Sequence, residues 1–327
     1  MRYSLPHEKF DINHPLISQE YAVYTPMIDE MALTVGNWID ELRPGGYIYG
    51  ASRFGKSKGV NWFLNQILKE RFGVTLPLVI WSRRETQYSE SEFWHELLIA
   101  AEFEFVDHSK RPRKSEGFHL FVMRLISLAK IALRNHVILV IDEAQGLTFK
   151  EWLWLVGLYN ALDKKNTRLT LISIGSHQMG YKHELMSVSG NAHVAARFMS
   201  CHAKFHGIRS QDELTYVLLG YDEASEWPAG SGTSYFAYFA PEHFRSGKRL
   251  SSCAEVIWAV LTELRPDNVK KRNLEYPMQH ICWAIESAIF RLALGANWSD
   301  VMSYGTWMSE LKKVELPLHL KIISNHG

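Results

Sequence analysis

A chain of 327 residues is long enough for one α/β domain and a smaller second domain. Its hydrophobic content of 46% and aromatic content of 13% exclude an intrinsically disordered protein. The formal net charge of +1 excludes attraction to polyanions through bulk charge, so nucleic-acid binding would have to come from local basic clusters. The three cysteines show no C-x-x-C spacing, so we expect no disulfide framework and a reducing compartment.

The N-terminal residues 1–24 lack strong periodicity, and we expect them to form an arm on the surface. They contain no apolar stretch of the signal-peptide kind, which favours a cytoplasmic location. Apolar residues at helical spacing occupy 27–42, and the breaker cluster at 44–46 ends this helix. The most apolar long window, 121–141, is interrupted by charged residues, so no membrane span is expected.

Residues 50–57 form a complete G-x-x-x-x-G-K-[ST] phosphate loop between an expected strand at 47–49 and an expected helix at 57–70. Glycines let backbone N–H groups surround a phosphate chain, and the helix N-terminus adds the positive end of its dipole. We expect Lys56 to reach the β- and γ-phosphates of ATP and Ser57 to ligate Mg²⁺. The candidate nucleotide-binding residues of this segment are Gly50, Ser52, Arg53, Phe54, Gly55, Lys56, Ser57 and Lys58.

A second motif, VILVIDEAQ at 137–145, is a buried apolar strand that ends in two carboxylates. Asp142 suits a direct or water-mediated hold on Mg²⁺, and Glu143 suits polarising the attacking water. The two motifs in this order predict an NTP-binding fold. The chain is therefore expected to be an ATPase with ATP and Mg²⁺ as cofactors.

The remaining pattern alternates short apolar runs with amphipathic segments as far as residue 210. Further strands are expected at 76–81, 168–176 and 203–208, and further helices at 90–103, 118–133, 152–162 and 193–199. Uninterrupted apolar strands alternating with helices predict a parallel sheet covered on both faces. Beyond residue 210 only helices are expected. The predicted organisation is an arm at 1–24, an α/β ATPase core at 25–210, and a helical lid with a tail at 211–327.

The order of these strands, followed by a helical segment, resembles the plan of AAA+ ATPases. The resemblance implies a five-stranded parallel sheet sandwiched by helices, followed by a small all-helical lid. It also implies a polar sensor residue beside the γ-phosphate at the end of strand 168–176. Ser176 is the first choice for this role and Gln178 the second, and an ordinary strand-end turn is the alternative.

Arg197 lies at the end of the short helix before the last strand, where AAA+ proteins place an arginine finger. The resemblance implies that Arg197 reaches the ATP of a neighbouring subunit, so that hydrolysis requires an assembled interface. The alternative is a surface arginine that interacts with the helix dipole. The start of the expected lid helix, 276–279, has no second-sensor arginine, although Arg272 and Arg291 lie nearby.

Within AAA+ proteins, residues 14–210 resemble the TnsC/TniB-type transposition regulators of prokaryotic transposons. The segments that carry this resemblance are His14-Pro15-Leu16, GASRFGKS, VIDEAQGL, ISIGSHQM and Ala196-Arg197-Phe198. The resemblance implies ATP-dependent homo-oligomers, rings or helical filaments, on double-stranded DNA. It also implies recruitment of transposase subunits, disassembly on hydrolysis, and a targeting partner of the TniQ type, in some systems linked to an RNA-guided complex.

The segment 110–114 carries four cations in five residues around a proline and could contact phosphates without reading bases. A solvated surface loop is the alternative. Arg83 and Arg84 follow the second strand and could join this track, or they could pair with Glu85 or Glu90. The candidate DNA-binding residues are Arg83, Arg84, Lys110, Arg111, Arg113 and Lys114.

Three other functions fit parts of the sequence. A replicative-helicase loader is similar in size and DNA handling. A translocating motor or helicase is suggested by the DEAQ motif, but the strand-free residues 211–327 offer no second sheet. The third is a signalling NTPase without DNA in its cycle. The tail from Pro317 could dock on a partner or could be a frayed end.

Overall fold

The computed structural model describes most of the chain. The described residues are 9–84, 88–104, 110–188, 190–266 and 275–324. Contacts between Cα atoms divide the chain into two compact units. The α/β unit comprises Ile28–Gly50 and Lys56–Phe205. The helical unit comprises Met1–Met27, Ala51–Gly55 and His206–Gly327, so the tip of the phosphate loop belongs to it by contact.

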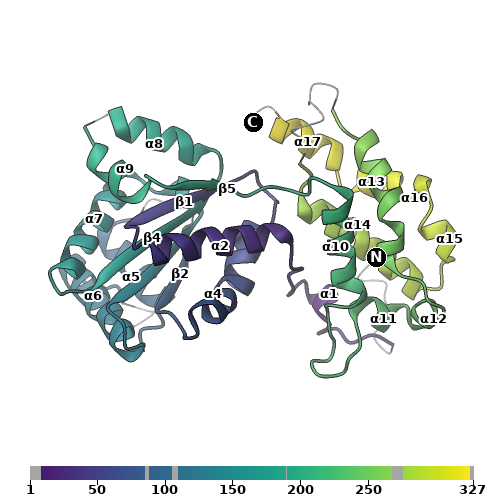
Figure 1. Cartoon of the computed structure of the whole chain (residues 1–327), viewed down its shortest axis with the longest axis horizontal. Coiled ribbons are helices and arrows are strands. Elements are labelled where there is room, and N and C mark those ends of the chain that lie inside the picture. Colours follow the sequence, from purple (N-terminus) through teal and green to yellow (C-terminus); the bar gives the residue numbers. More distant parts are fainter. Residues whose placement is uncertain (1–8, 85–87, 105–109, 189, 267–274, 325–327) are drawn as a thin grey trace. The chain divides into compact units, whose positions relative to one another are not determined.

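Five parallel strands form the sheet of the α/β unit, in the order β2-β3-β4-β1-β5 (Figure 1). Their bounds are Gly45–Tyr49 for β1, Leu78–Ser82 for β2, His136–Asp142 for β3, Arg168–Gly175 for β4 and His202–Lys204 for β5. The predicted parallel sheet is confirmed. Strand β3 is an uninterrupted apolar run from Val137 to Ile141, and β4 is buried from Leu169 to Gly175, because both faces of these central strands are covered.

The register of the sheet determines which loops meet. Ser82 pairs with Asp142, and Tyr49 pairs with Gly175. Because all five strands are parallel, the residues that follow β1, β3 and β4 lie at one edge of the sheet. The ends of both sequence motifs therefore meet at this edge.

Helices cover both faces of the sheet. On one face, Val137, Leu139 and Ile141 of β3 pack in a core with several helices. Among these helices are α5 (Glu90–Ala100), α6 (Lys114–Ile131), α7 (Phe149–Asp163) and α9 (Ala192–Phe198). The alternate residues Ile138 and Val140 are also fully buried, and they point to the other face. Figure 1 shows α2 (Pro26–Asp40) and α4 (Asn65–Phe72) on that side.

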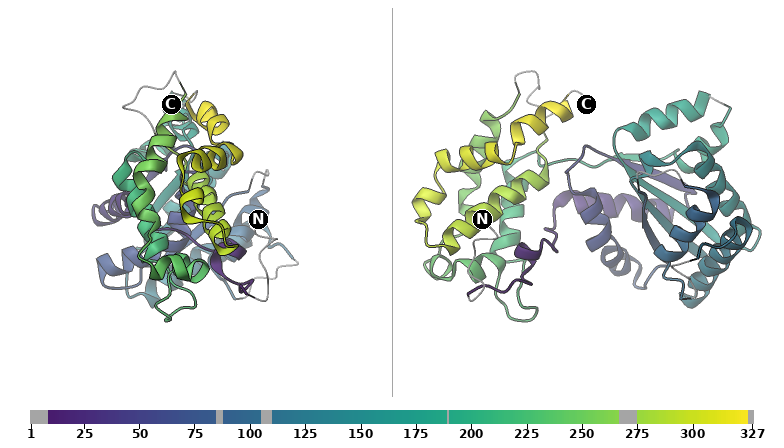
Figure 2. Two further views of the ribbon diagram at one scale, coloured as in Figure 1. Left: turned by 90° about the vertical axis from the view of Figure 1, so that its right-hand side faces the viewer. Right: turned by 180° about the vertical axis from the view of Figure 1, so that it is seen from behind.

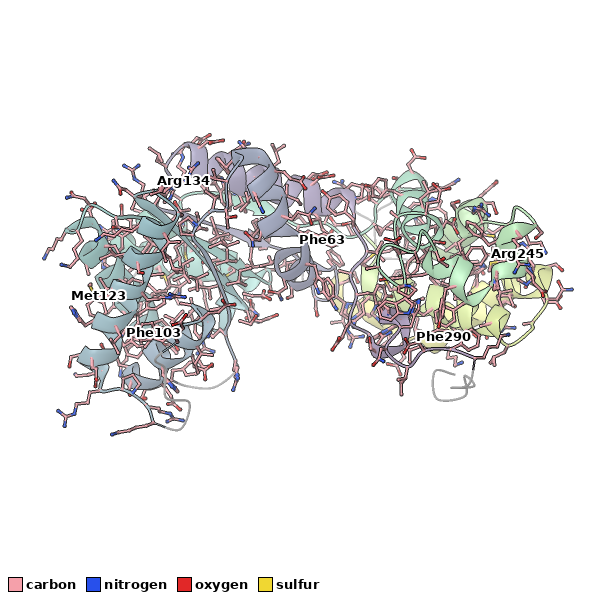
Figure 3. All side chains as sticks on the ribbon, turned by 90° about the horizontal axis from the view of Figure 1, so that it is seen from below. Phe63, Phe103, Met123, Arg134, Arg245 and Phe290 are labelled. Atoms are coloured by element: carbon pink, nitrogen blue, oxygen red, sulfur yellow. The ribbon has the colours of Figure 1, made fainter. Side chains whose placement is uncertain are left out.

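The helices expected at 57–70 and 118–133 differ from their predicted bounds. The helix expected at 57–70 consists of α3 (Lys56–Gly59), a π-helical stretch at Val60–Leu64, and α4. Helix α6 begins at Lys114 and not at 118, because the Glu116 carboxylate accepts a hydrogen bond from the Arg113 N–H and caps the first turn. The last residue of the basic segment, Lys114, is therefore helical. Further along the same helix, Met123 lies on its outer surface (Figure 3).

Helix α8 (Gln178–Val188) follows β4 and was not expected from the sequence. Its apolar residues Tyr181, Leu185 and Val188 are exposed, and only Met179 and Met186 are buried. A helix whose apolar side chains largely face solvent gives no amphipathic pattern that points to the core. The sequence pattern therefore predicts no helix at 178–188.

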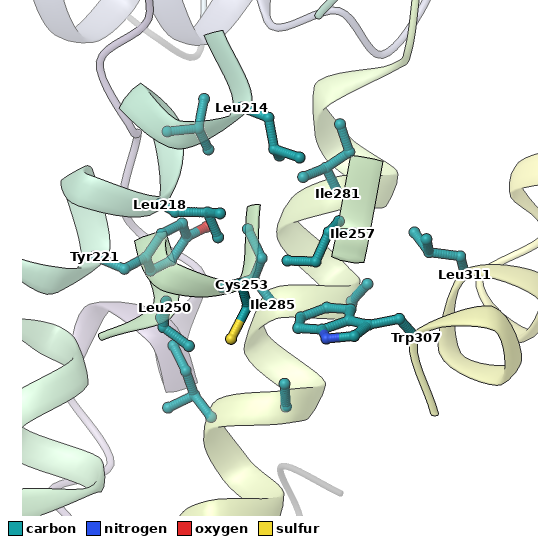
Figure 4. Packing of buried hydrophobic residues seen from close by; sticks show 14 of the residues in the cluster. Leu214, Leu218, Tyr221, Leu250, Cys253, Ile257, Ile281, Ile285, Trp307 and Leu311 are labelled. Atoms are coloured by element: carbon teal, nitrogen blue, oxygen red, sulfur yellow. The ribbon is translucent and has the colours of Figure 1, made fainter. Parts of the chain in front are cut away.

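The helical unit packs around one hydrophobic core. Leu214, Leu218 and Tyr221 of α10 face Ile281 and Ile285 of α14 in this core (Figure 4). The other helices of this unit pack against the same core, and Figure 2 shows the unit from two further sides. The helices are α1 (Pro15–Ser18), α10 (Gln211–Asp222), α11 (Tyr235–Phe239), α12 (Pro241–Arg245), a 3₁₀ turn (Leu250–Cys253), α13 (Ala254–Glu263), α14 (Met278–Ala293), α15 (Trp298–Val301), α16 (Tyr304–Lys313) and α17 (Leu316–Ser324). Among the described helices of either unit, none has the length and apolarity needed to cross a membrane.

The N-terminal segment is part of the core of the helical unit and not a surface arm. Phe10, Leu16 and Tyr21 are buried in that core. His14 is fully buried among the rings of aromatic residues, and its Nδ1 accepts a hydrogen bond from the Leu16 N–H at 3.1 Å. The C-terminal segment also packs on this core, because α17 buries Leu316 and Leu320. Sequence periodicity missed both segments because they are short.

Candidate active site

The phosphate loop joins β1 to α3, and two of its glycines have clear structural reasons. A Cβ on Gly50 would lie 2.2 Å from the carbonyl oxygen of Phe205, so no other residue fits there. Gly55 adopts a φ of 106°, which side chains with a Cβ rarely tolerate. The two glycines of the motif are thus required for different reasons, Gly50 by a close backbone neighbour and Gly55 by its own backbone conformation.

Lys56 begins α3 and points back along the loop. Its Nζ donates a hydrogen bond to the carbonyl oxygen of Gly50 at 2.9 Å. Burial lowers the pKa of Lys56 from 10.5 to about 8, although the carboxylates of Glu143 and Asp142 oppose this shift. A half-buried ammonium at the start of a helix, with its Nζ on the carbonyl oxygen of Gly50, suits a polyphosphate partner.

Ser57 and Asp142 come together from the two sequence motifs. The Ser57 hydroxyl is hydrogen-bonded to the Asp142 carboxylate, which also accepts a bond from the Glu143 N–H at 2.9 Å. Burial raises the pKa of Asp142, and both hydrogen bonds oppose the increase. A hydroxyl and a carboxylate in contact are hard oxygen ligands, so this pair fits Mg²⁺.

Glu143 follows β3 in the left-handed backbone region, with φ 56° and ψ 34°. Its carboxylate accepts a hydrogen bond from Gln145 Nε2 at 2.5 Å. The other end of the Gln145 amide accepts a bond from the N–H of Ser176 at 3.0 Å. No pattern in the sequence singles out Gln145, because only the folded sheet brings the end of β4 beside the end of β3.

The two other catalytic candidates differ in position. Ser176 lies at the end of β4, next to residues 142–148 after β3, which we call the acidic loop. Its Oγ accepts a hydrogen bond from the Gln178 N–H at 3.3 Å. Arg197 lies on α9, where it donates to Asn160 Oδ1 at 3.1 Å and stacks over Tyr159 at 4.7 Å. The structure therefore brings Ser176 to the acidic loop, and it places Arg197 on the half-buried surface of the α/β unit.

The tip of the phosphate loop is held by residues of α14 and α17. His319 donates to the carbonyl oxygen of Ser52 at 3.3 Å, and the Gln279 N–H donates to that of Arg53 at 3.1 Å. The Arg53 guanidinium lies 3.3 Å from His280 Nε2 and stacks over Trp283 at 5.4 Å. The sequence contains no pattern that points to these contacts.

Other candidates for the nucleotide site have separate partners. Phe54 is buried and lies against Gly207, which has no room for a Cβ there. Lys58 is exposed and lies over the Trp62 ring. Arg291, the lid arginine considered from the sequence, is 3.8 Å from Glu310. Arg272 lies outside the described residues.

Arg83 requires a correction among the basic candidates. Its side chain is buried and paired with Glu151 of α7 at 3.2 Å, and its Nη1 donates to the carbonyl of Arg84. This guanidinium stabilises the acidic loop from inside and is not presented on the surface. Arg84 itself is exposed.

The cluster at 110–114 stays on the surface. Lys110, Arg113 and Lys114 are exposed, whereas Arg111 forms an ion pair with Glu92 at 2.7 Å. Because Lys114 is the first residue of α6, the cluster lies at the positive end of a helix dipole.

Comparison with known proteins agrees with this geometry. Residues 40–179 match a family model described as an AAA domain. No curated protein matches the sequence. The ORC2 protein of Aeropyrum pernix, solved as ADPNP and ADP complexes, is similar with a TM-score of 0.58 at 12% identity, covering 92% of this chain and 72% of that one. A Walker-type ATPase of Pyrococcus abyssi gives a TM-score of 0.50 at 14% identity, covering 91% and 74%.

Identities this low establish the fold alone. The sheet order, the phosphate loop and the helical C-terminal part define the chain as an AAA+ P-loop NTPase fold.

Proposed function

We propose that this protein is an AAA+ ATPase that assembles on double-stranded DNA when ATP is bound and links target-site selection to transposase recruitment. The observation that carries the ATPase part is the meeting of Lys56, the Ser57–Asp142 pair and Glu143 at one edge of the sheet. Each of these groups has a separate role in phosphoryl transfer.

In the proposed reaction, Lys56 binds the β- and γ-phosphates, and the amides of the phosphate loop orient them. Mg²⁺ held by Ser57 and Asp142 would neutralise phosphate charge. Glu143 accepts a proton from the attacking water while the water oxygen bonds to the γ-phosphorus. The bond between the γ-phosphorus and the bridging oxygen then breaks, and this oxygen leaves with ADP. Ser176 contacts the γ-phosphate from the end of β4.

Assembly depends on Arg197. The α/β unit uses this guanidinium only at its own surface, where Asn160 and the Tyr159 ring fix its direction. A fixed, partly exposed arginine is suited to reach the nucleotide of a second copy, because little side-chain entropy is lost on contact. ATP then joins two subunits, and hydrolysis removes the γ-phosphate that holds them together.

The assembly proposal is tested by electron microscopy with a slowly hydrolysed ATP analogue, with and without duplex DNA. We expect rings or filaments for the wild type and for Arg168→Ala, a control that removes another exposed arginine, the first residue of β4. Arg197→Ala should remain monomeric. Glu143→Gln should bind ATP without hydrolysing it and should form persistent assemblies. Monomers of the wild type under every condition would refute the proposal.

Contacts to DNA are assigned to the exposed cations Arg84, Lys110, Arg113 and Lys114, with Arg111 partly engaged by Glu92. Replacing Lys110 and Arg113 together by alanine should weaken duplex binding and reduce the salt dependence of log K by about one unit per lost phosphate contact. The matched control removes two exposed cations at the end of α7, Lys164 and Lys165. Equal losses for the two double variants would contradict a specific basic track.

The transposition role depends on the resemblance to TnsC/TniB-type regulators. The alternative is a replicative-helicase loader or another DNA-dependent AAA+ ATPase, and the similarity in fold to an ORC2 protein favours keeping it. Affinity capture with the tagged full chain, ATP analogue and DNA separates the two. Recovery of transposase subunits and a TniQ-type protein supports the adaptor. Recovery of a replicative helicase without transposase supports the loader.

A further inference from the structure

Gln145 connects two parts of the candidate site. It lies in the turn Ala144–Gly146 directly after β3 and Glu143. Its Nε2 donates to Glu143 Oε2 at 2.5 Å, and its Oε1 accepts from the Ser176 N–H at 3.0 Å. A carboxylate only accepts and a backbone N–H only donates, so these two partners fix the orientation of the amide.

The end of β4 provides the space for this amide. A Cβ on Gly175 would lie 2.6 Å from Gln145 Oε1 and 2.8 Å from Met179 Cγ. Gly175 is not among the residues with a positive φ, so the effect of an alanine here would come from the close approach, because its Cβ would displace the Gln145 amide or the Met179 side chain. Position 175 is therefore matched to the side chain at position 145.

The turn that carries Gln145 is held on both sides. The Arg83 N–H donates to the carbonyl oxygen of Asp142 at 3.0 Å. Arg83 Nη1 lies close to Gly146, 2.8 Å from the position that a Cβ on this glycine would take. From α8, Lys182 Nζ donates to the carbonyl of Leu147 at 2.5 Å. With its backbone fixed in this way, the Gln145 amide has little freedom to leave its two partners.

We propose that Gln145 is a positioning residue that aligns the Glu143 carboxylate with the Ser176 end of β4. This inference rests on the proposed function, in which Glu143 orients water and Ser176 lies beside the γ-phosphate. Glu143 has a left-handed backbone conformation, so the direction of its side chain is set by the backbone and by the hydrogen bond from Gln145 Nε2. Gln145 thus controls how the water is aimed, without touching ATP.

The experiment measures kcat and KM for ATP in Gln145→Ala, Gln145→Glu and Gly175→Ala. In Gln145→Ala we expect kcat to fall by about 100-fold while KM stays within about twofold, because misplacement of a catalytic group acts on the transition state. Gln145→Glu keeps the shape and the acceptor for Ser176 but places a second carboxylate against Glu143, so kcat should fall as far. Gly175→Ala should lower kcat by displacing the amide.

Two comparisons separate positioning from a structural role. The double variant Gln145→Ala with Gly175→Ala should be no slower than the slower single variant, because both changes break the same link. Gln66→Ala, an exposed glutamine on α4, should keep the wild-type rate. Thermal unfolding is recorded for each variant, and the kcat loss should exceed any change in the folded fraction.

The two proposals can fail separately. Wild-type hydrolysis by Glu143→Gln would overturn the proposed role of Glu143 itself. An inactive Glu143→Gln together with wild-type kcat in Gln145→Ala or Gln145→Glu would overturn only the inference about Gln145. A faster Gln145→Ala enzyme would overturn it as well, because the link would then restrain Glu143 and not position it.

Discussion

Buried polar groups are arranged differently in the two units. In the α/β unit one group of them lies at the end of β3, where Arg83 and Glu151 pair beside the loop that begins with Asp142. In the helical unit they lie within the core. There Tyr21 forms hydrogen bonds with both Tyr221 and Glu286, across 200 and 265 residues of sequence.

This difference suggests two purposes for the same chemistry. Burying a polar group costs free energy unless it is hydrogen-bonded, so each cluster has to be compensated locally. In the α/β unit the clusters support the candidate active site. In the helical unit they specify how the N-terminal segment joins the helices. Substitutions in the first set should affect chemistry and stability together, and those in the second should affect stability alone.

The largest effect on stability is expected at Arg83. Arg83→Ala leaves the Glu151 carboxylate buried without its guanidinium partner, which should lower the free energy of unfolding by about 3–5 kcal/mol. The double variant Arg83→Met with Glu151→Gln removes both charges and keeps an acceptor for the Thr148 cap, so its loss should be smaller. Urea unfolding of the variants measures both.

The neighbouring Arg84 provides the control. Because its side chain is exposed, Arg84→Ala should change stability by no more than about 0.5 kcal/mol. If Arg83→Ala were equally mild and instead reduced DNA affinity, the guanidinium would serve DNA and not the acidic loop.

The next effect concerns Lys56, where burial within the α/β unit is unfavourable for stability. The pKa of Lys56 is about 8 in the folded chain against 10.5 for the ordinary side chain. Between these values the unfolded chain binds the extra proton, so wild-type stability rises with pH through this window. Below pH 8 the buried ammonium lowers the free energy of unfolding by its full amount, about 3 kcal/mol.

Lys56→Met should therefore be more stable than the wild type at pH 7, by up to that amount, and should lose ATP binding. Its advantage should shrink as the pH is raised from 8 towards 10.5. Urea unfolding at pH 7 and pH 9 provides the comparison. A Lys56→Met variant that is less stable than the wild type at pH 7 would show that the ammonium stabilises the fold.

The sequence predicted those parts of the molecule that depend on local pattern. The strand β3 was recognisable from its uninterrupted apolar run, and the phosphate loop from its glycines. Each of these signals lies within a stretch of a few residues. Lys56, Ser57 and Asp142 were assigned for the same reason, and the sheet brings them together.

The rest depends on contacts between distant residues. The bond from Gln145 to Ser176 exists only because β3 and β4 are neighbours. Arg83 looked like a surface cation because its partner Glu151 lies 68 residues further along the chain. His319 contacts Ser52 across 267 residues. No periodicity or motif within one segment encodes such pairs.

The smallest effect sharpens the comparison from the helical side. The Tyr21 hydroxyl donates to Glu286 and lies 2.9 Å from the Tyr221 hydroxyl, so Tyr21→Phe removes both bonds while keeping the ring in the core. We expect the free energy of unfolding to fall by about 1–2 kcal/mol. Gln19 still donates to Glu286 at 3.2 Å, which limits the loss. Affinity for a fluorescent ATP analogue should be unchanged.

The control for this variant is Tyr216→Phe, on the exposed side of α10, which should be neutral. Urea unfolding of the two variants gives the difference directly. If both variants are neutral, the N-terminal segment is held by the apolar contacts of Phe10 and Leu16, and the buried hydroxyls add nothing. If Tyr21→Phe instead weakens nucleotide binding, the polar core of the helical unit contributes to the site, and the two purposes are not separate.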